Sequence, residues 1–152
     1  EQVDFLIHFI PDLRQIPFNI HLETNGVHAE ALSKIIDFCD VVAADIKLPS
    51  MMGRSYWEEH EAFLRTAGAN SFVKTVVAHT VTDEEFDTLI QLLLRIHPTP
   101  TLILQPLTPI SGKRSFLQPP TAECLKNFLV KARAVLPDVR LIPQMHRVWQ
   151  IP

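Results

Sequence analysis

The sequence predicts an α/β domain built on a parallel sheet, and three observations support this fold class. Short apolar runs alternate with helical patterns along the chain, as in βαβ units. The run over residues 41–46 has no polar alternation, which is typical of a parallel strand covered on both faces. Four of the runs end in polar residues just before a helical pattern. Because the carboxyl ends of parallel strands lie on one rim, we expect a ligand site there.

Length and composition fit a single soluble domain. The chain has 152 residues, 47% of them hydrophobic and 20% charged, and a formal net charge of −3. It has no clustered Lys/Arg face for nucleic acid, and its apolar stretches fall short of the roughly 20 residues that cross a bilayer. Cys39 and Cys124 lie in apolar helical patterns, so we expect buried thiols and a cytoplasmic protein. The acidic start at Glu1 is no signal peptide, and we expect the chain to begin inside a domain.

The first half of the chain begins with apolar residues at helical spacing, which predict a helix, and Pro11 disturbs the last turn of this helix. Gly26 permits a tight exit from the first strand. Gly68 begins a segment that ends a helix before a β-branched strand. The expected elements are a helix over 3–13, a strand over 18–22, a helix over 29–39, a strand over 41–46, a loop over 49–55, a helix over 57–67 and a strand over 72–77.

The second half contains the clearest local signal, a capping box in which Thr82 precedes a helix and Glu85 follows three residues later. A Pro-rich segment after His97 stops this helix, and Thr121 can cap the last one. The other expected elements are a strand over 101–105, an irregular stretch over 106–120 of the length usual for functional loops, a strand over 139–142 and a tail over 143–152.

Five segments carry a resemblance to a known family: Leu22-Glu23-Thr24-Asn25-Gly26, Asp45-Ile46-Lys47, Val73-Lys74-Thr75-Val76-Val77, Leu104-Gln105-Pro106 and Pro143-Gln144-Met145-His146-Arg147. In this order they resemble the later part of the radical S-adenosylmethionine (SAM) enzymes, and most closely the 7-carboxy-7-deazaguanine synthase branch. The resemblance covers essentially the whole chain and implies a partial (β/α)6, TIM-like barrel.

The resemblance also implies that the chain is one portion of such a barrel. Family members hold a [4Fe–4S] cluster with a Cys-x-x-x-Cys-x-x-Cys loop and bind the methionine amino group with a Gly-Gly-Glu-Pro strand end. This sequence contains neither motif. We therefore expect residues 1–152 to form the C-terminal portion of a single radical SAM domain, with about four βα units and without the first two strands.

For the complete enzyme the resemblance implies conversion of 6-carboxy-5,6,7,8-tetrahydropterin to 7-carboxy-7-deazaguanine, a step toward queuosine. The implied cofactors are S-adenosylmethionine, a [4Fe–4S] cluster and Mg²⁺, and a 5′-deoxyadenosyl radical starts the ring contraction. The chain alone is expected to be inactive, because its two cysteines cannot hold the cluster. The expected partner is a pterin-like small molecule, without nucleic acid or membrane, and the oligomeric state stays open between monomer and homodimer.

Two other functions remain open at this stage. An Asp-x-Lys strand end also occurs in radical SAM enzymes that activate a glycyl radical partner, and a protein-docking groove would favour that function. The chain could also serve as a non-catalytic ligand-binding or interaction module. Binding of S-adenosylmethionine without any cluster would favour this last interpretation.

The cofactor residues that the resemblance implies are Asp45, Lys47, Thr24, Asn25 and Gln105. Asp45 and Lys47 share one side of a strand, where a carboxylate suits ribose hydroxyls and an ammonium suits the SAM carboxylate. The alternative for this pair is an ion pair that supports the barrel. Thr24 and Asn25 could instead hydrogen-bond their own turn, and Gln105 could be a core amide.

The implied substrate residues are Gln144, His146 and the terminal carboxylate of Pro152, with a tail packed on the outer helices as the alternative. Lys74 lies inside a strand, and we expect it to pair with a carboxylate such as Asp45. The histidines show no His-x-His or His-x-x-x-His spacing, so we expect no metal site formed by this chain and assign it no catalytic residue.

Overall fold

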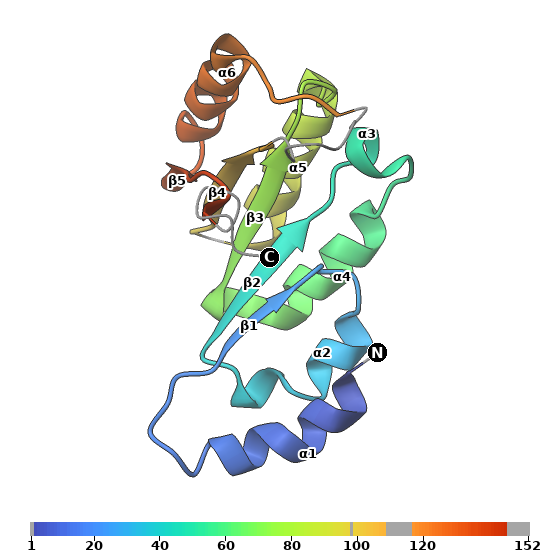
Figure 1. The fold of residues 1–152 in the computed structure, drawn as a ribbon, viewed down its shortest axis with the longest axis vertical. Helices are drawn as coiled ribbons and strands as arrows, with labels where there is room; N and C mark the ends of the chain where they lie inside the picture. The colour runs from blue at the N-terminus through green and yellow to red at the C-terminus, as the bar shows by residue number, and fades with distance from the viewer. Residues whose placement is uncertain (1, 98, 109–116, 146–152) are drawn as a thin grey trace.

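The structure, a computed structural model, describes residues 2–97, 99–108 and 117–145. Its centre is one parallel sheet in which the strand order follows the chain order (Figure 1). The strands are β1 (His21–Thr24), β2 (Val41–Ile46), β3 (Ser71–Val77), β4 (Thr101–Pro106) and β5 (Asp138–Leu141). The helices are α1 (Val3–Leu13), α2 (Ala29–Ser33), α3 (Pro49–Met52), α4 (Trp57–Ala67), α5 (Asp83–Ile96) and α6 (Ala122–Arg133), with the 3₁₀ helices η1 (Ile36–Phe38) and η2 (Gly68–Asn70). Four strand-to-helix units followed by β5 confirm the predicted α/β class.

One face of the sheet carries the hydrophobic core. Alternate residues of the three central strands are buried on this face: Val42, Ala44, Ile46, Val73, Thr75, Val77, Leu102 and Leu104. The apolar ones join a cluster with Phe63 of α4 and Phe86 of α5. The residues between them point to the opposite face, and most are only half-buried. We call this opposite face the open face; it includes Glu23, Ala43, Asp45, Lys74 and Gln105.

The capping signals in the sequence are confirmed. The Oγ1 atom of Thr82 accepts a hydrogen bond from the Glu85 N–H at 3.2 Å, and the Glu85 carboxylate accepts from the Thr82 N–H at 3.3 Å. Thr121 caps α6 by accepting from the Cys124 N–H at 3.1 Å. The predicted bounds of α1, β2 and α4 agree with the structure, while β3 begins one residue earlier, β4 ends one residue later and β5 lies one residue earlier than predicted. Residues 109–116 of the predicted irregular stretch lie outside the described residues.

The first strand was predicted too early in the chain. Residues 18–22 are apolar, but β1 begins at His21, which pairs with Val41, and Phe18 is 62% exposed. The Ile20 N–H donates to the Asp40 carboxylate at 2.7 Å, so this neighbour satisfies the backbone before the ladder starts. Pairing with β2, which the sequence does not show, therefore sets the start of β1.

Two segments next to the first strands also differ from prediction. The expected helix over 29–39 is divided, because α2 ends at Ser33 and η1 follows. The Ser33 hydroxyl donates to the Glu30 carbonyl at 2.8 Å, which competes with the helical pattern. The expected loop over 49–55 begins with the short helix α3. Pro49 at its first position favours a helix start, and Gly53 ends it with a φ of 71°.

Candidate functional site

Asp45 and Lys47 form an ion pair at the carboxyl end of β2. The Lys47 Nζ lies 2.6 Å from the Asp45 Oδ2, and both side chains are partly exposed. The other carboxylate oxygen, Asp45 Oδ1, is buried and has no hydrogen-bond partner within the described residues. The structure thus places both side chains on one side of the strand and joins them in an ion pair, as in the alternative interpretation, and the pair keeps one acceptor unused.

Buried oxygens without a partner occur in β2 and in the segments that follow β2 and β3. Within the described residues, the buried side-chain oxygens that lack a hydrogen bond are Asp45 Oδ1, Ser50 Oγ and Thr80 Oγ1. Ser50 lies in α3, just after β2, and Thr80 follows β3. Buried polar atoms are almost always hydrogen-bonded in proteins, and exceptions often mark a site where a ligand or water belongs. The carboxyl rim of β2 and β3 is therefore the best candidate site.

Lys74 is paired on the open face, but not with the carboxylate that we expected. Asp45 is its register neighbour on β2, yet the Lys74 ammonium contacts the Glu23 carboxylate on β1. The lysine side chain is only 16% exposed, whereas that of Glu23 is 66% exposed. Since β2 separates the two strands, the side chain crosses it near Ala43, a small residue in register with Glu23. Asp45 therefore pairs with Lys47 and not with Lys74.

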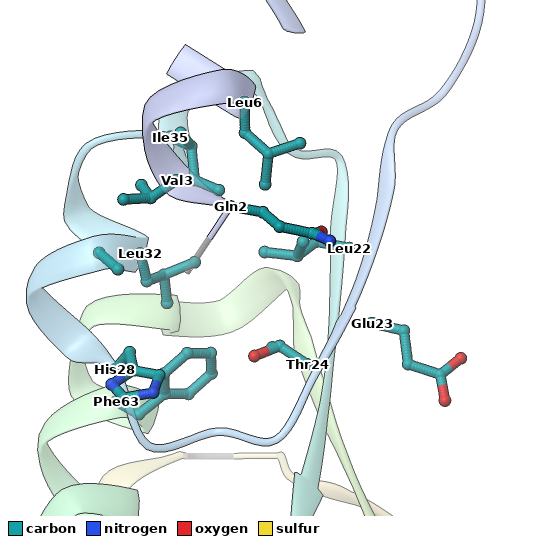
Figure 2. A pocket seen from close by; sticks show the side chains of 11 residues that line it. Gln2, Val3, Leu6, Leu22, Glu23, Thr24, His28, Leu32, Ile35 and Phe63 are labelled. Atoms are coloured by element: carbon teal, nitrogen blue, oxygen red, sulfur yellow. The ribbon is translucent and has the colours of Figure 1, made fainter. Parts of the chain in front are cut away.

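Thr24 lies on the other face of the sheet from Asp45. It is in register with Ala44, which belongs to the core face, and it lines a cavity of about 180 Å³ among α1, α2 and β1. Figure 2 shows Thr24 pointing into this cavity and Glu23 pointing away from it. The Thr24 Oγ1 accepts from the Gly26 N–H at 3.4 Å, which fits the turn-forming alternative. Asn25 is exposed in the same turn.

The remaining predicted residues lie near the ends of β4 and β5. Gln105 is in register with Val76 and points to the open face with Lys74. Gln144 accepts from the Thr108 N–H through Oε1 at 2.9 Å, which ties the segment after β5 to the loop after β4. His146 and Pro152 lie outside the described residues.

His60, which was not predicted as a site residue, is a buried histidine that connects the loops after β1 and β2. Its Nδ1 lies 2.8 Å from the Gly26 carbonyl oxygen, and its Nε2 accepts from the Lys47 N–H at 3.1 Å. Burial lowers the pKa of His60, although the hydrogen bonds to both loops oppose this shift. A signal was present, because His60 shares the buried stripe of α4 with Phe63, Leu64 and Ala67.

The thiols of this chain do not fit an iron–sulfur cluster. Burial raises the pKa of Cys39 and of Cys124, which favours protonated thiols over the thiolates that bind iron. Across the described ranges, no three His, Cys, Asp or Glu side chains are grouped to hold a metal ion. In the same part of the chain, no helix has the length and apolar character to span a membrane.

The fold places the chain in a structural class. It matches part of a solved radical SAM methyltransferase from Sphaerobacter thermophilus with a TM-score of 0.61 and 16% sequence identity. The match covers 82% of this chain and 40% of that protein. A five-stranded parallel sheet that superposes on part of this enzyme is consistent with the predicted partial TIM-like fold of radical SAM type.

The sequence comparison is more specific. The chain is 35% identical over 147 residues to the 7-carboxy-7-deazaguanine synthase of Geobacter sulfurreducens. The match covers 95% of this chain, and the chain spans 56% of the length of that relative. No family model matches the chain. The similarity confirms the resemblance that the five motif segments predict.

Proposed function

We propose that this chain supplies the SAM-binding and substrate-binding rim of a radical SAM enzyme that makes 7-carboxy-7-deazaguanine from 6-carboxy-5,6,7,8-tetrahydropterin. The observation that carries the proposal is the Asp45–Lys47 ion pair at the carboxyl rim, in which the buried Asp45 Oδ1 atom has no hydrogen-bond partner among the described residues. The similarity to a synthase of this name supports the choice of reaction. The two thiols are consistent with a cytoplasmic enzyme.

The residues on the rim suit S-adenosylmethionine in charge and hydrogen bonding. Asp45 Oδ1 is buried, and if the side chain turns toward the rim this oxygen can accept from a ribose hydroxyl without losing an existing bond. Lys47 can neutralise the methionine carboxylate while it stays close to Asp45. When it is bound beside a reduced cluster, S-adenosylmethionine supplies the radical chemistry of such enzymes.

The substrate side of the proposal uses the open face and the tail. Gln105 offers an amide donor and acceptor on the open face for a pterin-like ring. Gln144, His146 and the Pro152 carboxylate are proposed to close the substrate site, with Mg²⁺ as a further cofactor. The [4Fe–4S] cluster has no ligand set among the residues of this chain, so we assign it to none of them.

The activity test uses the complete protein that the gene encodes, reconstituted anaerobically with iron and sulfide. Incubation with S-adenosylmethionine, Mg²⁺ and 6-carboxy-5,6,7,8-tetrahydropterin should yield 7-carboxy-7-deazaguanine by mass spectrometry. The 152-residue chain treated in the same way should stay colourless, because cluster binding requires more thiolates than it has. Cofactor cleavage without the deazapurine product would contradict the proposed substrate.

The residue-level test is Lys47→Met in the complete protein. Loss of the ammonium should raise the Kd for S-adenosylmethionine at least tenfold, which corresponds to about 1.4 kcal/mol. The unfolding free energy should change by less than about 1 kcal/mol, because a partly exposed ion pair contributes little.

Lys131→Met is the matched control for this substitution. Lys131 is 36% exposed against 33% for Lys47, and it is also ion-paired, with the Asp83 carboxylate at 2.9 Å. Since Lys131 lies on α6, this variant should keep the wild-type Kd. An unchanged Kd in Lys47→Met would remove Lys47 from the cofactor site.

A further inference from the structure

His60 joins two rim loops that are far apart in the sequence. It is fully buried on α4 and lies between the turn after β1 and the segment after β2. The Lys47 N–H can only donate, so Nε2 must be the unprotonated nitrogen. The proton is then on Nδ1, which donates to the Gly26 carbonyl at 2.8 Å. A single neutral tautomer satisfies both backbone groups.

The turn after β1 is shaped to accept this ring. Gly26 has a φ of 66°, and a Cβ added there would lie 3.4 Å from His60 Nδ1 and 3.5 Å from the Ala44 Cβ. Any side chain at this position would therefore face both a disfavoured backbone conformation and the imidazole. The turn that carries Asn25 is held directly against His60.

The second bond acts on Lys47, the cation of the candidate site. The Lys47 amide is held by His60, while its ammonium lies 2.6 Å from Asp45. Asp45 and Lys47 are both attached to the end of β2, so a shift of the Lys47 backbone changes where its ammonium sits relative to Asp45. A residue that fixes this amide fixes the direction in which the lysine leaves the strand.

We infer that His60 is a positioning residue, whose acceptor Nε2 sets the placement of Lys47 for cofactor binding and whose donor Nδ1 holds the turn at Gly26. The inference rests on the proposed function, since it gives His60 a role in binding the same cofactor. It also predicts different consequences for the loss of each of the two hydrogen bonds. Loss of the Nε2 bond should weaken cofactor binding, whereas loss of the Nδ1 bond should mainly loosen the turn.

Two substitutions of His60 by residues with a side-chain amide, made in the complete protein, distinguish the effects of the two hydrogen bonds. In His60→Gln the side-chain amide can reach the position of Nε2 and accept from Lys47, while in His60→Asn it reaches only the position of Nδ1. Both variants lose one buried hydrogen bond, so both should lower the Tm to a similar extent. The Kd for S-adenosylmethionine, measured by titration calorimetry, should rise at least tenfold in His60→Asn and less than threefold in His60→Gln.

His97→Gln is the matched control at the other end of the sheet. His97 also joins two backbone groups: Nδ1 accepts from the Thr99 N–H at 3.2 Å, and Nε2 lies 3.2 Å from the Ala69 carbonyl oxygen. This variant should leave the Kd unchanged. Equal Kd values for His60→Asn and His60→Gln, at similar losses in Tm, would overturn the inference.

Hydrogen exchange distinguishes this failure from a failure of the proposed function. Without cofactor, the Lys47 amide should exchange at least tenfold faster in His60→Asn than in wild type and in His60→Gln. The Leu104 amide in the core strand β4 serves as the internal reference. If wild-type protein binds no S-adenosylmethionine, the proposed function fails. The exchange rate of the Lys47 amide then tests the positioning role by itself, and an unchanged rate in His60→Asn refutes that role.

Discussion

The two ends of the parallel sheet are held by side chains of different burial. At the carboxyl end, His60 bonds the loops after β1 and β2, and the Thr75 hydroxyl donates to the Ile46 carbonyl at 2.9 Å. Within the described residues, His60 and Thr75 are the polar residues that are buried as a whole. At the amino end, the corresponding contacts come from Asp40, His97 and Thr101, which are all at least partly exposed.

The difference shows where the molecule tolerates the cost of burying polar groups. A buried polar group is costly unless its hydrogen bonds are complete, so it is a demanding way to hold a loop. It also fixes geometry better than an exposed contact, which water can replace. A binding site needs supporting side chains with locked positions, and these occur at the end that carries Asp45 and Lys47.

The largest effect is expected from Gly26→Val, which disturbs the turn at the carboxyl end. A Cβ at this position would already be in van der Waals contact with His60 Nδ1 at 3.4 Å and with the Ala44 Cβ at 3.5 Å, in a backbone with positive φ. The two methyl groups that valine adds beyond Cβ therefore displace the ring. The left-handed backbone costs about 1 kcal/mol, and displacement of the ring from a buried hydrogen bond adds about 1 to 2 kcal/mol. Urea unfolding should therefore show a loss of roughly 2 to 3 kcal/mol.

Gly53→Val provides the comparison for this prediction. Gly53 has a similar φ of 71°, but an added Cβ would meet nothing within 4 Å. Only the backbone cost of about 1 kcal/mol should remain. Equal losses in the two variants would mean that His60 does not hold the turn.

A smaller effect is expected from Thr75→Val, which removes the other buried tie at the carboxyl end. Valine keeps the shape of the side chain but leaves the Ile46 carbonyl without the hydroxyl donor. The unfolding free energy should fall by about 1 to 2 kcal/mol. Thr101→Val at the amino end removes a half-buried bond to Asp138 and should cost less than about 1 kcal/mol. A larger loss of unfolding free energy from Thr101→Val than from Thr75→Val would contradict the view that the buried contacts at the carboxyl end contribute more.

The helices and strands that depend on local sequence signals could be predicted from the sequence. The Thr82 capping box and the apolar run of β2 gave the correct elements, because caps and buried parallel strands act over a few residues. The start of β1 could not be predicted in this way. It depends on pairing with Val41, which lies twenty positions beyond His21 in the chain.

The candidate site was predictable in its residues and less so in its connections. Asp45 and Lys47 are neighbours in sequence, so their pairing follows from the strand. The contact from Lys74 to Glu23 depends on strand order and on the small Ala43 between them, neither of which a single sequence displays. His60 was missed because one polar residue in an apolar helical stripe gives no indication of its partners.

The smallest effect is expected in the pH dependence of stability, which arises from the buried base at the carboxyl end. Burial lowers the pKa of His60 below its ordinary value of 6.5, while the bonds to Gly26 and Lys47 and the nearby carboxylates of Glu59 and Asp45 oppose this shift. Well above pH 6.5 the ring is neutral in both the folded and the unfolded chain, so its contribution is complete. Below that pH the unfolded chain takes up a proton that the folded chain resists, and stability is lost until the folded pKa is reached.

Glutamine at position 60 cannot titrate. The difference in unfolding free energy between wild type and His60→Gln should therefore narrow as the pH falls from 7 to 5. Subtracting the two curves cancels the titration of groups that both proteins share. Urea unfolding at several pH values measures this difference, and a gap that stays constant or widens toward pH 5 would show that the folded protein binds the proton at His60 at least as readily as the unfolded chain does.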